Sequence, residues 1–103
     1  MREVTKVPFE IGTVMICSKC GAKFNEPQLA ESVKSEMRKV QKEQESHTKV
    51  RVIVSGCLGV CYPERQTIAF MPVEGKTEMW TTELKKDEVL SAVKQIVELK
   101  LKK

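Results

Sequence analysis

The chain has 103 residues, a length that suits one domain with a single hydrophobic core. Hydrophobic residues make up 41% of the chain and charged residues 31%, which excludes a disordered or fibrous class and predicts a soluble globular protein. The net charge of +4 is modest, and acidic residues are interleaved with the basic ones over residues 31–51, so nucleic acid is not expected as the main partner. Because no apolar run approaches the roughly 20 residues of a membrane span and the charged N-terminus lacks an apolar signal region, we expect a cytoplasmic location and no membrane partner.

The first predicted elements are a strand and a long helix. Residues 11–16, "IGTVMI", are rich in β-branched side chains and predict a strand that ends at Cys17, followed by "CSKCGAKF" as a loop. The helix is expected to start from an N-cap at Asn25 and to run to about Glu45. Its buried stripe should consist of residues that recur at helical spacing, namely Leu29, Val33, Met37 and Val40.

The second half of the chain predicts three strands and a helix. Residues 49–55, "KVRVIVS", are apolar on both faces except at Arg51, which is typical of a central strand. A loop with the last two cysteines follows. Residues 67–73 and 77–83 then predict a hairpin, and Pro72 indicates that the first of these strands is near an edge or ends there. Residues 87–101 predict the final helix, with its apolar side formed by Val89, Leu90, Val93, Ile96, Val97 and Leu101.

The predicted order is therefore β-α-β-β-β-α, in one domain that covers residues 1–103. A crossover helix joins the first two strands, so they should be parallel, and the hairpin should add antiparallel strands. We expect an α/β fold with a mixed sheet packed by two helices, in a layout similar to that of thioredoxin-like proteins.

Four cysteines form two pairs, and each pair follows a predicted strand: Cys17 with Cys20, and Cys57 with Cys61. In a reducing cytoplasm such cysteines are more often metal ligands or redox-active thiols than structural disulfides. Adjacent parallel strands end at the same edge of a sheet, where open α/β sheets bind their ligands. The two pairs are therefore expected to meet in space.

The residues alone leave three kinds of thiol site open. Four thiolates can hold zinc, or a 2Fe-2S cluster with two thiolates on each iron. The spacing of Cys17 and Cys20, followed by glycine, is typical of a zinc knuckle, but the second pair has three intervening residues and does not repeat it. The single histidine, His47, excludes a Rieske centre and is expected to be solvated. Dithiol exchange by the first pair is the third alternative, although a loop position would deprive that pair of the helix start that lowers a thiol pKa.

The complete cysteine pattern, with "SGCLGVC" directly after a strand, resembles the thioredoxin-like 2Fe-2S ferredoxin family, which includes the small two-iron subunit of respiratory NADH dehydrogenases. The resemblance extends from about Ile11 to Glu98. It implies a one-electron carrier rather than an enzyme, and often a homodimer. It also implies that a 2Fe-2S cluster is held by Cys17, Cys20, Cys57 and Cys61. The first pair is more closely spaced than is usual in that family, so a zinc-binding structural or interaction module and a dithiol-disulfide oxidoreductase remain alternatives.

The surroundings of the cysteines suggest how they would be used. Gly56 and Gly59 leave room for backbone N–H groups to point at sulfur. Lys19, Lys23 and Arg65 lie in or beside the cysteine segments and would make the rim of the site positive, so we expect acidic redox proteins as partners. The sequence contains no serine-histidine-acid set and no glycine-rich phosphate loop, so no catalytic constellation is predicted.

Overall fold

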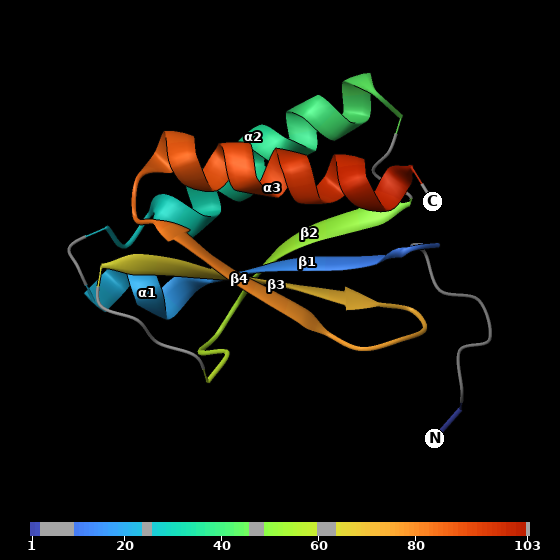
Figure 1. Cartoon of the computed structure of the whole chain (residues 1–103), viewed down its shortest axis with the longest axis horizontal. Helices are drawn as coiled ribbons and strands as arrows, with labels where there is room; N and C mark the ends of the chain where they lie inside the picture. The colour runs from blue at the N-terminus through green and yellow to red at the C-terminus, as the bar shows by residue number, and fades with distance from the viewer. Residues whose placement is uncertain (3–9, 24–25, 46–48, 60–63, 103) are drawn as a thin grey trace.

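The computed structural model describes residues 1–2, 10–23, 26–45, 49–59 and 64–102. These residues form an α/β fold with a four-stranded mixed sheet in the order β2-β1-β3-β4 (Figure 1). The strands are β1 (Gly12–Cys17), β2 (Val50–Ser55), β3 (Arg65–Pro72) and β4 (Glu78–Glu83). The helices in this part of the chain are α1 (Ser18–Lys23), α2 (Leu29–Glu43) and α3 (Lys86–Leu101).

The sheet is organised around β1. This strand pairs in parallel with β2 and antiparallel with β3, which in turn pairs antiparallel with β4. The predicted strand directions are therefore confirmed, and β3 ends at Pro72 as expected. The prediction that β2 is a central strand is wrong, because β2 lies at the edge of the sheet. Its apolar sequence has another cause: Val50 and Val52 are buried in the core beneath the helices, while Ile53 on the opposite face is only half-buried.

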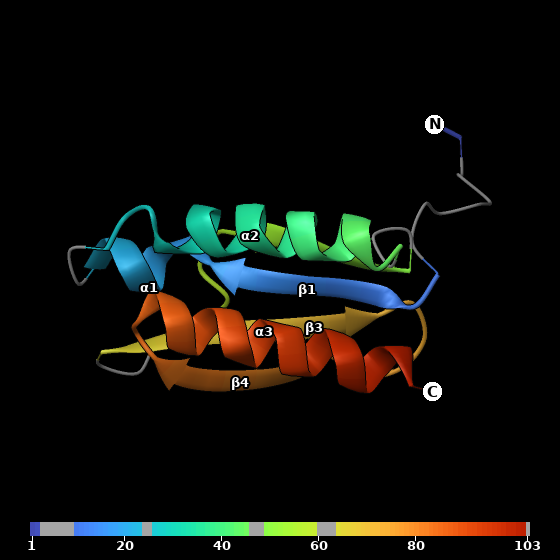
Figure 2. The same ribbon diagram turned by 90° about the horizontal axis from the view of Figure 1, so that it is seen from above.

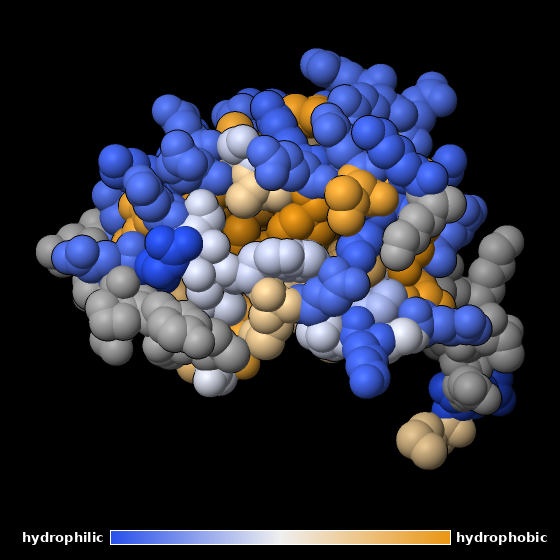
Figure 3. Space-filling view, viewed as in Figure 1, coloured by the Kyte–Doolittle hydropathy of each residue, from blue (hydrophilic) through white to orange (hydrophobic). Residues whose placement is uncertain are grey.

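Helices α2 and α3 cover one face of the sheet, side by side (Figures 1 and 2). The core lies between these two layers, and alternate residues of each strand enter it. Figure 3 shows hydrophilic side chains over the outer sides of the helices and hydrophobic ones beneath them. The largest members of the core include Ile16, Ile68, Phe70 and Met37.

The α2 helix starts later than the sequence predicted. Gln28 occupies the N-cap position without a side-chain cap bond, and Asn25 lies outside the described residues. The predicted stripe is buried as expected except for Val40, which is half-buried. Gln41 was not predicted to be buried, yet it is 2% exposed and its Nε2 donates a hydrogen bond to the Val50 carbonyl at 2.7 Å. This bond ties the end of α2 to the start of β2.

Phe70 of β3 is packed from two sides. On one side its ring lies so close to Gly12 that a Cβ atom there would stand 2.6 Å from the ring tip, and 2.6 Å from the Met71 carbonyl oxygen. On the other side is Lys100 of α3, whose Nζ lies 4.9 Å from the ring centroid. Gly12 is therefore required by close packing, since a side chain at this position would displace the ring or the strand.

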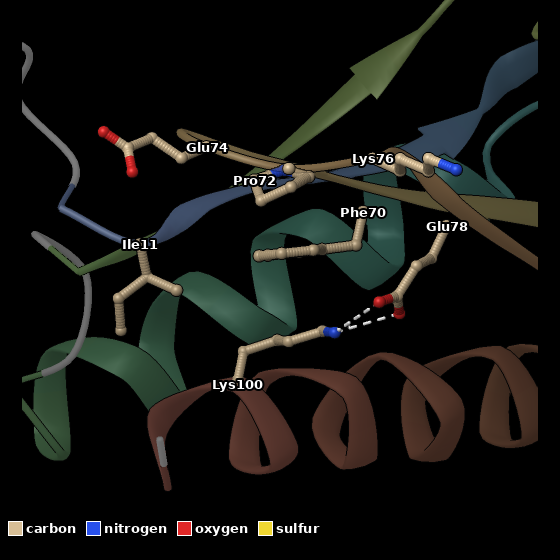
Figure 4. A pocket seen from close by; sticks show the side chains of 8 residues that line it. Ile11, Phe70, Pro72, Glu74, Lys76, Glu78 and Lys100 are labelled. Carbon is tan, nitrogen blue, oxygen red and sulfur yellow. Dashed lines mark hydrogen bonds and ion pairs between the residues drawn. The ribbon is translucent and has the colours of Figure 1, made fainter.

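Lys100 connects the last turn of α3 to β4. It is only 6% exposed, and its Nζ donates to the two carboxylate oxygens of Glu78 at 2.9 and 3.0 Å (Figure 4). The ion pair lies beside a hollow of about 360 Å³ that also includes Ile11 and Glu74, at the end of the sheet remote from Cys17. The buried ammonium is thus compensated by a carboxylate and an aromatic face, as a buried charge requires.

The two partners of this ion pair should differ in their effect on stability. Glu78→Ala leaves a buried ammonium without its carboxylate, and we expect it to lower the free energy of unfolding by about 1–3 kcal/mol. Lys100→Met keeps an apolar stem against Phe70 and leaves behind a carboxylate that is already half-exposed, so the expected loss is below about 1 kcal/mol. Urea unfolding with an unchanged m value measures both losses. A larger loss for Lys100→Met than for Glu78→Ala would contradict this account.

Candidate thiol site at the ends of β1 and β2

The site is built at the edge of the sheet where β1 and β2 end together. In their parallel register Cys17 is opposite Ser55, two residues before Cys57. The backbone N–H of Leu58 donates a hydrogen bond to the Cys17 sulfur, so the segment after β2 contacts the thiol at the end of β1. The two segments therefore meet at one edge of the sheet, but the expected meeting of the thiol pairs is not seen among the described residues, because Cys57 is exposed and does not group with Cys17 and Cys20.

The segment after Cys17 is helical, so its prediction as a loop is wrong. Cys17 is the last residue of β1, and α1 begins at Ser18. The backbone N–H groups of Lys19 and Cys20 donate to the Cys17 sulfur, which therefore takes the place of the oxygen that usually caps a helix start. The first cysteine pair thus lies at the start of a helix, where the sequence analysis predicted a loop.

The described cysteines are free thiols that differ in exposure. Cys17 is 0% and Cys20 5% exposed, and the two thiols contact each other through a hydrogen bond. Cys57 is exposed, and its sulfur accepts a hydrogen bond from the N–H of Gly59 at 3.4 Å. Gly59 has a φ of 82°, a left-handed conformation that suits glycine. Cys61, the fourth predicted ligand, lies outside the described residues.

The pKa values of the two buried thiols are shifted in opposite directions. Burial alone would raise the pKa of Cys17, but hydrogen bonds from the N–H and thiol of Cys20 and from the N–H groups of Leu58 and Lys19 stabilise the thiolate, and the pKa is lowered. Burial raises the pKa of Cys20, and the negative charge of Cys17 raises it further, against the hydrogen bonds from Thr67. Cys17 therefore loses its proton at lower pH than Cys20 does.

Two residues of β3 support the pair and were missed in the sequence analysis. Thr67 bonds to the Cys20 sulfur, and Gln66 donates from Nε2 to the Cys17 carbonyl at 2.8 Å. Both side chains are fully buried. Both are polar residues directly before the apolar run "IAF", and this could have indicated their role. Polar side chains inside a strand are buried only where they have hydrogen-bond partners.

The remaining residues that the sequence analysis singled out are described only in part by the structure. Lys19 and Arg65 are exposed, and the Arg65 guanidinium donates to the hydroxyl and carbonyl oxygens of Thr81 at 2.8 and 3.0 Å. The side chain of Lys23 and all of His47 lie outside the described residues. Within the described ranges, no three cysteine, histidine or acidic side chains gather as a metal site. None of the described helices is long and apolar enough to cross a membrane.

Comparisons of the chain with protein-family models, with curated proteins and with solved structures give no match. Fold and site therefore define the class of this protein by themselves: a small α/β protein with a buried dithiol where two parallel strands end.

The pKa difference between the buried thiols predicts an order of reaction in reduced, metal-free protein. A lowered pKa keeps Cys17 a thiolate at more acidic pH, whereas a raised pKa delays ionisation of Cys20 to more alkaline pH. We expect the pH profile of Cys17 alkylation by iodoacetamide to be displaced to the acid side of the Cys20 profile. Peptide mass spectrometry under single-hit conditions measures both profiles. Coincident profiles, or Cys20 ionising first, would contradict the assignment.

Proposed function

We propose that this protein is a small one-electron carrier, with a thioredoxin-like fold, whose four cysteines hold a 2Fe-2S cluster. The observation that supports it most is the hydrogen bond from the Leu58 N–H to the Cys17 sulfur, because it joins the two cysteine segments at one edge of the sheet. Thiolate-bound clusters are stabilised by N–H groups that point at their sulfur ligands. The element order, apart from α1, is also the order that the resemblance to the ferredoxin family implies.

The donor set fits such a cluster in its chemistry. Soft thiolates favour iron-sulfur clusters or zinc, and Cys17 and Cys20 already lie together as a pair that can serve one iron. Cys57 and Cys61 would serve the other iron. Since Cys57 is exposed and does not group with the first pair, the segment after β2 would have to close over the site.

The surrounding residues would tune and protect the group. When bound, a 2Fe-2S cluster accepts and releases one electron. Cys17 and Cys20 are enclosed and would keep water from one side of it. The N–H groups of Lys19 and Leu58 stabilise negative charge on sulfur, which favours the reduced state and raises the potential. Free thiols also suit a reducing compartment such as the cytoplasm, and the implied homodimer is part of this proposal.

Dithiol-disulfide exchange is the second candidate, because Cys17 stands at the start of α1 with a lowered pKa. In that reaction the Cys17 thiolate attacks a substrate disulfide and displaces one substrate thiolate, forming a mixed disulfide. Cys20 then loses its proton and displaces the second substrate thiolate. Two electrons pass from the dithiol to the substrate, and a Cys17–Cys20 disulfide remains.

Elemental analysis of anaerobically purified protein tests the proposed function. We expect about two iron and two sulfide per chain and visible charge-transfer absorption, as a 2Fe-2S cluster requires. Serine at Cys17, Cys20, Cys57 or Cys61 should each abolish or sharply reduce cluster retention, whereas the control His47→Ala should retain it. Stoichiometric zinc without sulfide would identify the zinc alternative. Metal-free protein that reduces disulfides and loses this activity in Cys17→Ser would identify the oxidoreductase.

We also propose that an acidic redox protein docks at the positive rim formed by Lys19, Lys23 and Arg65. Lys19 is exposed on α1, directly beside the buried pair, so its charge can act on an approaching partner. Lys19→Glu should lower the second-order rate of electron transfer to an acidic redox protein by about 2- to 10-fold at low salt and weaken its salt dependence. The control is Lys39→Glu, the same charge change at an exposed position of α2. Equal effects of the two variants would argue against docking at this rim.

A further inference from the structure

Gln66 of β3 is buried directly behind the thiol pair in an unusual hydrogen-bonding state. It is 0% exposed, and its Nε2 donates to the Cys17 carbonyl at 2.8 Å and to the Thr67 carbonyl at 2.9 Å. Two carbonyl acceptors require the nitrogen on that side, so the orientation of the carboxamide is determined. Its Oε1 is consequently buried without a partner among the residues that the structure describes.

Since the Gln66 Oε1 has no partner in the described part of the chain, the stabilising bonds of this carboxamide there are the two that its Nε2 donates. A buried acceptor without a hydrogen bond loses its bonds to water without replacement, a cost that an apolar side chain would avoid. The β1–β3 ladder is paired as far as Ile16 and Ile68. Cys17 comes just after that pair, where the chain leaves β1 for α1. The Gln66 side chain therefore holds the carbonyl at the corner between these two elements.

We infer that Gln66 is a positioning residue for the thiol pair. By holding the Cys17 carbonyl, it fixes the corner between β1 and α1. The Cys17 sulfur is thereby kept enclosed and in line with the N–H groups of Leu58 and Lys19. What the pair does chemically rests on the proposed function, but this positioning can be measured without a cluster.

Gln41 provides a matched control within the same chain. It is also a buried glutamine, 2% exposed, and its Nε2 donates to a strand carbonyl, that of Val50, at 2.7 Å. Val50 begins β2, so this bond lies at the opposite end of the sheet from the thiols. Gln41→Met and Gln66→Met therefore each remove a bond from a buried glutamine to a carbonyl distant in sequence, but only Gln66→Met acts at the Cys17 corner, where it also removes the bond to the adjacent Thr67 carbonyl.

The experiment measures alkylation by iodoacetamide in reduced, chelator-treated protein, with Cys57 as the exposed internal reference. Enclosed Cys17 reacts only when the corner opens, so Gln66→Met should raise the Cys17 to Cys57 rate ratio about tenfold, the size expected for one lost hydrogen bond to a buried group. Gln66→Leu also removes the donor but fills the position with a branched apolar side chain, and it should raise the ratio by about as much. Gln41→Met should leave the ratio within about twofold of the wild type.

The inference is overturned if Gln66→Met and Gln41→Met raise the ratio equally, since general destabilisation would then explain both. It is also overturned if Gln66→Met raises the ratio and Gln66→Leu does not, because packing would then be responsible, or if neither variant at position 66 raises it. Should Gln66→Met fail to fold, Gln66→Leu is compared with Gln41→Met in its place. A protein that binds no iron would refute the proposed function and leave this measurement valid, so the two failures are distinguishable.

Discussion

The parallel pairing of β1 with β2 is the constraint on which the rest of the structure depends. It brings the chain after Cys17 and the chain after Ser55 to the same edge of the sheet. A parallel pair also needs a crossover, and α2 supplies it while covering the sheet. With β1 held between β2 and β3, the Cys17 thiol at its end accepts hydrogen bonds from backbone N–H groups, while the Gln66 side chain of β3 holds the Cys17 carbonyl.

Much of the fold could be predicted from the sequence, because periodicity reports which faces are buried. The β-branched runs identified the strands, and a crossover helix between two of them implied parallel pairing. The order of the sheet could not be predicted in the same way. An edge strand that lies under a helix on one face and is half-buried on the other has the composition of a central one, as β2 does. The composition of a strand indicates how much of it is buried, but it does not indicate how many neighbouring strands it pairs with.

The candidate site was only partly predictable, for a different physical reason. Cysteine spacing located the thiols, but the sulfur at the start of α1 accepts from the Lys19 and Cys20 N–H groups, and capping rules built on oxygen acceptors do not describe it. Gln66 and Lys100 are buried polar residues whose partners, Cys17 and Glu78, lie far away in sequence. Such pairs become recognisable only when the fold has brought them together.

The contact between Gly12 and Phe70 has a consequence for how this protein can diverge. A Cβ atom at position 12 would stand 2.6 Å from the ring tip, but also 2.6 Å from the Met71 carbonyl oxygen and 2.8 Å from the Pro72 Cα atom. No substitution at position 70 removes these two backbone atoms, so position 12 should stay glycine along a lineage even where position 70 changes. A smaller residue at 70 would instead remove the aromatic face beside Lys100, so positions 70 and 100 are the pair expected to covary.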